Sequence, residues 1–233
     1  DIPSFPLKAA KAIDLPSVLV ANFTWYDIYS QLQHANRNSD LLKILHEEYS
    51  SASIHFLPQF GLENDLKAPK KNNGFMSLKG KNQRNKLEAC LNKPLEGKTL
   101  IFIYLGIYDS SSLLWHNLEK LDDCIFITRD PQACPPRNLH IMDETFSYSD
   151  LIASADIIIT KFGYSTLASA FYHGKPVIAC DREQFCEGKV IRKFLIQNQT
   201  GVVVSKETFY ECQWEDPIKQ ARQINVKNNK ILS

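Results

Sequence analysis

Six short, continuously apolar segments in the second half of the chain constrain its fold more than any other feature. They lie at residues 100–105, 124–128, 139–142, 156–160, 176–180 and 201–205. Each is rich in β-branched residues, too short for a typical helix, and too uniformly apolar for a strand with one face in water. Such segments are typical of parallel strands that are buried on both faces.

Helical periodicity fills most of the gaps between these segments. The predicted helices lie at residues 111–121, 147–155, 165–173 and 187–197. The third of them ends at Gly174, a residue type that often terminates helices. Strands that alternate with helices predict βαβ units, and therefore a Rossmann-like α/β fold with a parallel sheet. We expect this domain to be complete over residues 96–233.

The first part of the chain contains fewer elements. They are predicted strands at 18–23 and 54–57 and predicted helices at 8–13 and 40–50. Two strands are too few for a stable α/β domain, and the chain begins at Asp1 without an initiator Met. We therefore expect residues 1–66 to be part of an incomplete N-terminal α/β domain, or to pack on the C-terminal one. Residues 67–95, which begin with a stretch rich in Lys, Asn and Gly, are the expected linker.

Charge and cysteine usage argue against several classes of function. The net charge of +1 gives no sign of a nucleic-acid or membrane-surface partner. No apolar run approaches the roughly 20 residues of a membrane span. Neither the six cysteines nor the six histidines have the spacing of a zinc site. We expect a cytoplasmic protein with reduced thiols and no metal; the composition leaves its oligomeric state open.

The turn after the fourth apolar segment is the best candidate binding site. It contains Lys161, Gly163, Ser165 and Thr166. Gly163 allows a positive φ or a close approach of the backbone to a ligand, and Ser165 or Thr166 can cap the following helix. The first N–H groups of that helix lack intrahelical partners, so with the helix dipole they favour a phosphate, to which Lys161 can add charge. The alternative is an ordinary strand-to-helix connection with a serine cap.

A second glycine turn follows the first apolar segment. Gly106 is followed by Tyr108 and a run of three serines, at residues 110–112, where the next predicted helix begins. Ligands of open α/β sheets bind beyond the carboxyl ends of the strands, so two such turns in one sheet favour a phosphate site. The alternative is a flexible loop that ends in a serine cap.

Two sets of motifs resemble known families. Residues 149–156 (SDLIASAD), 160–166 (TKFGYST) and 174–178 (GKPVI) resemble the donor-binding domain of GT-B glycosyltransferases of the family 28 C-terminal type. Residues 22–25 (NFTW) resemble a motif in the glycosyltransferase-like region of plant arabinose kinases. In that region an Arg-x-x-Phe-x-Glu segment follows the last large strand, and here it reads REQFCE at residues 182–187.

This resemblance implies a GT-B-like protein that binds a nucleotide-diphosphate sugar, UDP-linked in the families concerned, without a further cofactor or a bound metal. The residues that it places against the donor diphosphate are Gly163, Ser165 and Thr166, with Gly106 and Tyr108 on the loop across from them. The residues that it places near the ribose and base are Glu187, His140 and Met142. The chain departs from the family pattern at Lys161 and Phe162, where paired glycines are usual.

The polar residues after the first predicted strand are candidates for the acceptor side. Asn22, Thr24 and Trp25 follow that strand, and Trp25 could stack on a sugar. Asp27 is a weak candidate for the base that takes a proton from the acceptor hydroxyl. The alternative is that Trp25 is a packed aromatic and Asp27 a helix-capping residue.

Three functions are consistent with these features. The first is a glycosyltransferase that transfers the sugar of a nucleotide donor to an unknown acceptor. The second is a nucleotide-sugar epimerase or hydrolase on the same fold. The third is a non-catalytic module that binds a nucleotide sugar, because the Gly-rich loop and catalytic base of the family's first domain are not found in this chain.

Overall fold

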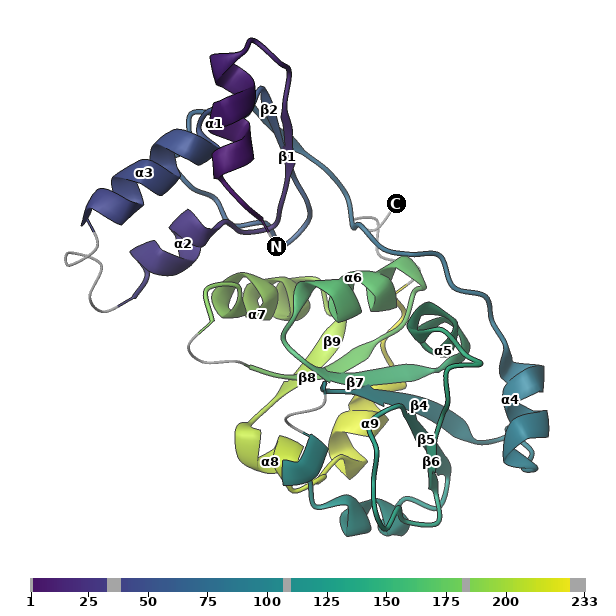
Figure 1. Cartoon of the computed structure of the whole chain (residues 1–233). Helices are drawn as coiled ribbons and strands as arrows, with labels where there is room; N and C mark the ends of the chain where they lie inside the picture. Colours follow the sequence, from purple (N-terminus) through teal and green to yellow (C-terminus); the bar gives the residue numbers. More distant parts are fainter. Residues whose placement is uncertain (1, 33–38, 107–109, 182–184, 227–233) are drawn as a thin grey trace. The chain divides into compact units, whose positions relative to one another are not determined.

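The chain divides into two α/β units, each with its own parallel sheet (Figure 1). The computed structural model describes residues 2–32, 39–106, 110–181 and 185–226. The first unit comprises residues 1–76 and 183–191, and the second comprises residues 77–182 and 192–233.

The first unit is built on a three-stranded sheet in the order β1-β2-β3, with all strands parallel. Its strands are β1 (Val18–Val20), β2 (Ile54–Leu57) and β3 (Lys70–Asn72), and its helices are α1 (Phe5–Ala12), α2 (Trp25–Ser30) and α3 (Ser39–Tyr49). Leu7 of α1, Leu19 of β1 and Tyr49 of α3 meet in a common buried core. Two helices and the edge strand β1 therefore bury apolar residues against one another.

Strand β3 lies in the segment 67–95 that the sequence suggested as a linker. It pairs in register with β2, from His55 opposite Lys70 to Leu57 opposite Asn72. Its sequence is Lys-Lys-Asn, and its residues are half-buried or exposed. Polar residues suit an edge strand, so this strand carries no apolar signal. The same segment also contains α4 (Arg84–Leu91) in the second unit.

The second unit contains a six-stranded parallel sheet in the order β6-β5-β4-β7-β8-β9. Its strands are β4 (Thr99–Tyr104), β5 (Cys124–Thr128), β6 (Leu139–Ile141), β7 (Ile157–Lys161), β8 (Val177–Cys180) and β9 (Gly201–Val204). They coincide with the six predicted apolar segments, which confirms the predicted parallel α/β sheet. Counted from β4, this is the 3-2-1-4-5-6 order of a Rossmann fold, whose order reverses between β4 and β7.

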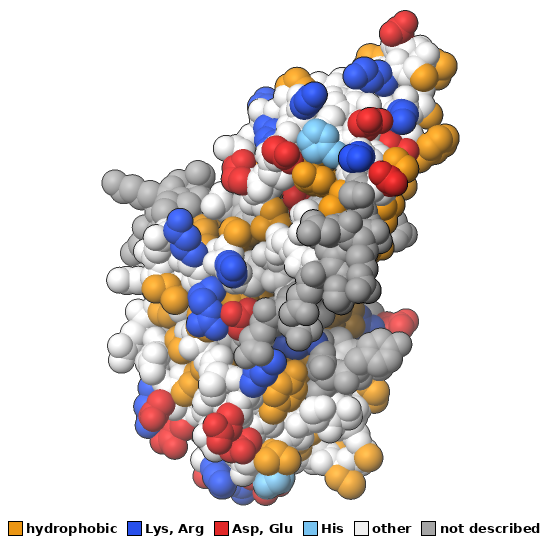
Figure 2. All heavy atoms as spheres, turned by 90° about the vertical axis from the view of Figure 1, so that its left-hand side faces the viewer, with side chains coloured by type: hydrophobic (Ala, Val, Ile, Leu, Met, Phe, Trp, Pro, Cys, Tyr) orange, Lys and Arg blue, Asp and Glu red, His pale blue; other side chains and the backbone are white. Residues whose placement is uncertain are grey.

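Helices cover both faces of this sheet (Figure 1). One face carries α5 (Tyr148–Ser154), α6 (Tyr164–Tyr172) and the end of α7 (Gly188–Gln197); the other carries α8 (Lys206–Tyr210) and α9 (Glu215–Ala221). No helix in the described ranges is both long and apolar enough to cross a membrane. On the face shown in Figure 2, acidic and basic side chains are interspersed over the described surface.

The prediction of an α-helix at residues 111–121 was wrong. The chain forms two short 3₁₀ helices there, η2 (Ser110–Ser112) and η3 (Trp115–Lys120). The Leu114 N–H donates to the Tyr210 carbonyl (2.9 Å), and the Trp115 indole N–H donates to the Ser110 carbonyl (2.8 Å). These tertiary bonds divert backbone groups from a regular helix, while Leu113 and Leu118 still reach the core.

Asp156, in the Ala-Asp pair that precedes β7, joins three elements of the second unit. Its carboxylate accepts two hydrogen bonds from the Arg84 guanidinium, both 3.0 Å, and one from the Leu100 N–H of β4 (2.8 Å). The Arg84 guanidinium also donates to the Leu95 and Lys98 carbonyls. Both bonds to Asp156 come from Arg84 Nη1, and these charge-assisted bonds fix α4 and the starts of β4 and β7 together.

Backbone N–H groups of the segment before α4 donate hydrogen bonds to side chains of α5 and of the residue that ends α6. The Gly80 N–H donates to His173 Nε2 (2.9 Å), and the Gln83 N–H donates to Ser154 Oγ (2.7 Å). Gly80 lies so close to α5 that an added Cβ would be 1.9 Å from the Ser149 carbonyl oxygen. This contact requires glycine at position 80.

We expect Gly80→Ala to destabilise the second unit by about 1–3 kcal/mol, because the new methyl group would overlap backbone atoms of α5. Urea unfolding monitored by circular dichroism measures the change. Gly74→Ala is the matched control, since a Cβ at position 74 meets no atom within 4 Å. Equal stability of the two variants would contradict the proposed packing of Gly80.

Candidate functional site

The reversal of strand order between β4 and β7 brings the two predicted glycine turns together. The two strands pair in parallel up to Tyr104 opposite Thr160. Gly106 follows Tyr104 by two residues, and Gly163 lies three residues beyond Thr160. Both turns are therefore at the carboxyl edge of the sheet, where open α/β folds bind ligands.

Gly163 opens space at the start of α6. It is the N-cap residue of the helix, with an extended backbone (φ −173°) in place of the positive φ that was one expectation. An added Cβ would meet no atom within 4 Å, so the space above this residue is open. The neighbouring Phe162 is buried, and its N–H donates to the Cys180 carbonyl (2.9 Å), which anchors the turn to β8.

Ser165 and Thr166 are the second and third residues of α6, so they are not its cap as the sequence suggested. The Leu167 N–H bonds back to the Gly163 carbonyl (3.4 Å). The N–H groups of Ser165 and Thr166 come before this bond and have no acceptor within the helix. Ser165 is exposed and Thr166 is half-buried. The helix start thus presents N–H and hydroxyl donors at the carboxyl edge of the sheet, where they suit an anion.

The Gly106 turn has a different geometry. Gly106 has φ +79°, in the left-handed region that favours glycine, and a Cβ there would also meet no atom within 4 Å. Positive φ at this position allows the chain to leave β4 sharply. Tyr108 lies outside the described residues, which resume at the buried Ser110 of η2.

Asp130, which the sequence analysis missed, supports the Gly106 turn from β5. It is 2% exposed, and its N–H donates to Thr128 Oγ1 (3.1 Å). Burial raises the pKa of the Asp130 carboxyl, although the Leu105 N–H that donates to it lowers that pKa. Its Oδ2 atom has no hydrogen-bond partner in the described structure. An acidic residue just after a buried strand was the sequence signal available for this position.

The residues expected near the nucleotide are only partly at this edge. Met142 follows β6 and is buried, with its N–H bonded to the Thr128 carbonyl (2.7 Å). His140 lies within β6, and its Nε2 is 3.3 Å from the Lys93 ammonium. Burial and the Lys93 charge lower the pKa of His140, which favours a neutral ring. Lys93 also donates to the Arg137 carbonyl, which precedes β6, so His140 is directed away from the glycine turns.

Thr24 and Asp27 form a compact hydrogen-bonded motif in the first unit. Thr24 caps α2: its hydroxyl accepts from the Asp27 N–H, and the Asp27 carboxylate accepts from the Thr24 N–H (2.6 Å). Asn64 donates to both carboxylate oxygens of Asp27, at 3.0 and 3.2 Å. Asp27 is buried, and this capping box gives it a structural role.

Asn22 and Trp25 have other surroundings. The Asn22 side-chain amide donates to the carboxylate of Glu187, which is buried and belongs to the same unit. The sequence analysis had treated these two residues as parts of different subsites. Trp25 is 39% exposed, and its ring lies 5.9 Å from that of Tyr29. Among these residues, Trp25 has the side chain most available to a ligand.

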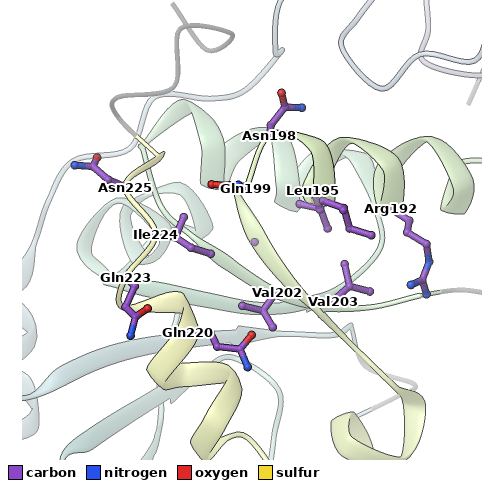
Figure 3. Close-up of a pocket in the computed structure, with 12 residues that line it drawn as sticks. Arg192, Leu195, Asn198, Gln199, Val202, Val203, Gln220, Gln223, Ile224 and Asn225 are labelled. Atoms are coloured by element: carbon purple, nitrogen blue, oxygen red, sulfur yellow. The ribbon is translucent and has the colours of Figure 1, made fainter.

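A pocket of about 920 Å³ lies along β9 (Figure 3). Leu195 of α7 and Val202 of β9 line it, together with Gln220 of α9 and Gln223 beyond that helix. Because β9 is separated from β7 by β8, this pocket is not part of the glycine-turn site. In the described residues, no group of three or more His, Cys, Asp or Glu side chains gathers as a metal site would require.

Comparisons with known proteins identify the fold. No protein-family model matches the chain. The chain is 20% identical over 229 residues to L-arabinokinase from Arabidopsis thaliana. The matched region covers 95% of this chain and 22% of that protein. It therefore spans about a fifth of the length of this relative.

Solved glycosyltransferases have the same fold. Spinosyn forosaminyltransferase SpnP matches with a TM-score of 0.63 and 15% identity over 93% of this chain and 64% of its own. The calicheamicin glycosyltransferase CalG4 matches with a TM-score of 0.64 and 11% identity, over 98% and 66%. UGT89C1 from Arabidopsis thaliana, in complex with quercetin, matches with a TM-score of 0.65 and 11% identity, over 98% and 62%. The chain has a GT-B fold and spans just under two thirds of these structures.

The two glycine turns should respond differently to alanine. We expect Gly106→Ala to destabilise the second unit by about 1 kcal/mol or more, because an L-residue is strained at φ +79°. We expect Gly163→Ala to change stability by less than about 0.5 kcal/mol, because its backbone is extended and its surroundings are open. Urea unfolding of both variants tests this contrast, and the reverse order of stability would contradict the turn geometry.

Proposed function

We propose that the second unit binds the diphosphate of a nucleotide sugar at the start of α6, as part of a glycosyltransferase. One observation carries this proposal: the open backbone turn at Gly163, on the carboxyl edge where the strand order reverses. The GT-B fold of the chain supports it, since the solved structures that share the fold are named as glycosyltransferases. The motif resemblance, which rests on different information, leads to the same turn.

The chemistry of this turn suits a leaving diphosphate. When the bond to the sugar breaks, negative charge increases on the diphosphate, and the fixed N–H dipoles of Ser165 and Thr166 would stabilise that charge without reorganising. Their hydroxyls would add donors, and Lys161 at the end of β7 would contribute a positive charge. Glycine at 163 would let phosphate oxygens approach the backbone, and Gly106, at the end of the neighbouring strand, would border the same site.

The donor and acceptor are assigned by analogy. UGT89C1 has been solved with UDP and with UDP-L-rhamnose, which favours a UDP-linked sugar here. For the acceptor we retain Asn22, Thr24 and Trp25, of which Trp25 has the exposed ring that a sugar or aromatic acceptor could stack on. Glu187 remains our candidate for the ribose, with Asn22 orienting its carboxylate. We do not assign the catalytic base to Asp27, because its carboxylate holds the capping box.

A change of charge at the helix start tests the site. We expect Ser165→Asp to weaken UDP binding at least about tenfold, because its carboxylate would repel the diphosphate at close range. The fold should be kept or slightly stabilised, since an acidic residue in the first turn favours a helix. Isothermal titration calorimetry with UDP measures the affinity, and thermal unfolding measures the stability.

Thr208→Asp is the matched control, because it adds the same charge to the first turn of α8 in the same unit. It should leave the UDP affinity unchanged. Equal affinity of the Ser165→Asp variant and the unmodified chain would place the diphosphate elsewhere. With UDP-sugars, hydrolysis or epimerisation without an acceptor would favour the second class of enzyme, and binding without turnover by the full-length protein would favour a binding module.

A further inference from the structure

An arginine and two tyrosines gather at the carboxyl edge of the sheet, outside the residues already assigned. Arg129 follows β5, Tyr104 ends β4 and Tyr148 begins α5. The Arg129 guanidinium carbon lies 4.5 Å from the centre of the Tyr148 ring, and the two tyrosine rings meet edge to face at 4.8 Å. The three residues belong to one cluster because β4 and β5 are parallel and α5 starts at the edge where they end.

The Arg129 guanidinium has few partners for a group so enclosed. Its side chain is 17% exposed, and its nearest acidic atom is Glu144 Oε1 at 3.9 Å, on a side chain that is 97% exposed. The Asp143 carboxylate also interacts electrostatically with Arg129, and it accepts a hydrogen bond from the Thr145 N–H. In the described structure the guanidinium donates no hydrogen bond. Five donors of a largely enclosed cation are expected to find acceptors, so a ligand is a natural source of them.

The position of Arg129 fits the far end of a nucleotide. From the Gly163 turn on β7, the sheet continues through β4 to β5. Two strand spacings amount to about 10 Å, which is comparable with the reach of a ribose and base beyond a diphosphate. We infer that Arg129 binds the base of the nucleotide donor and selects bases that carry a carbonyl oxygen on the recognised edge; this inference rests on the proposed function.

The selectivity follows from hydrogen-bond chemistry. A guanidinium has only donors. Uracil, thymine and guanine present a carbonyl oxygen where cytosine and adenine present an amino group, which is itself a donor. Tyr148, which is 41% exposed, packs against the Arg129 guanidinium and leaves part of its own ring surface for stacking. This cluster therefore favours UDP-, TDP- or GDP-linked donors over CDP- or ADP-linked ones.

The proposed positions of the diphosphate and the base also indicate where the ribose lies. If the diphosphate lies at the β7 turn and the base at β5, the ribose lies over the end of β4, beside the Gly106 turn. The proposed nucleotide would therefore extend from β7 across the carboxyl end of β4 to β5.

The experiment compares four nucleoside diphosphates and inorganic pyrophosphate by calorimetry on the whole chain. The unmodified chain should bind UDP and GDP about tenfold more tightly than CDP and ADP, the discrimination of one good arginine contact. Arg129→Ala should lose that preference and leave the pyrophosphate affinity unchanged. Arg137→Ala is the matched control: it removes an exposed arginine that pairs with Asp122 near the start of β6, and it should retain the preference.

The outcomes separate this inference from the proposed function. UDP and pyrophosphate binding with no preference among bases, or a preference that survives in Arg129→Ala, would overturn the role of Arg129 and leave the diphosphate site intact. Failure of every nucleotide and of pyrophosphate to bind would overturn the proposed function itself. If circular dichroism shows that Arg129→Ala is unfolded, Arg129→Lys replaces it. Lysine keeps the charge without the planar guanidinium. The affinity ratio of UDP and GDP over CDP and ADP should therefore fall to less than half of its value in the unmodified chain, and an unchanged ratio would contradict the inference.

Discussion

The parallel pairing of β4 with β7 is the constraint on which the rest of the second unit depends. Both strands are buried at the centre of the sheet, and the chain runs outward from them in opposite directions. Their carboxyl ends are therefore neighbours by construction, although Gly106 and Gly163 are far apart in the sequence. Asp156, just before β7, binds Arg84 and the Leu100 N–H near the start of β4. These bonds fix the amino-terminal ends of the two strands relative to each other, and thereby the positions of the two turns at their carboxyl ends.

The polar residues that make the sequence recognisable are largely used by the fold. Asp156 of the Ala-Asp pair clamps β4 and β7, and Asp27 completes the capping box with Thr24. At the proposed donor site, by contrast, the chemistry belongs mainly to backbone N–H groups at the start of α6. The backbone donors of the proposed site come from the helix start, so they do not depend on the side chains of Lys161 and Phe162, which stand where the family has glycines.

Much of the fold could be predicted because buried strands leave a strong pattern. All six strands of the second sheet were visible as apolar segments, most clearly the four inner strands β4, β5, β7 and β8, because burial on both faces excludes polar residues from them. The polar edge strand β3 left no such pattern, and the leucines at residues 113–121 have helical spacing but form 3₁₀ turns that are bonded to other parts of the chain. In the candidate site, Gly106 and Gly163 could be found because each follows a buried apolar segment and precedes a predicted helix, although only Gly106 needs glycine for its backbone conformation. Arg129 and Asp130 were missed, because charged residues just after a buried strand are common and this signal alone does not distinguish a functional residue.

The sequence by itself determined the class of sheet, the strand-to-helix turns and the glycines at them, because these depend on local propensity and on the periodicity of apolar residues. Only the tertiary structure decided which strand ends are neighbours, and hence that the two turns share one edge. It also decided the use of polar side chains, with Asp156 bound to Arg84 and Arg129 placed over the Tyr148 ring. The physical reason is that hydrogen bonds and ring contacts of this kind join residues distant in sequence, and strand order alone brings them within reach.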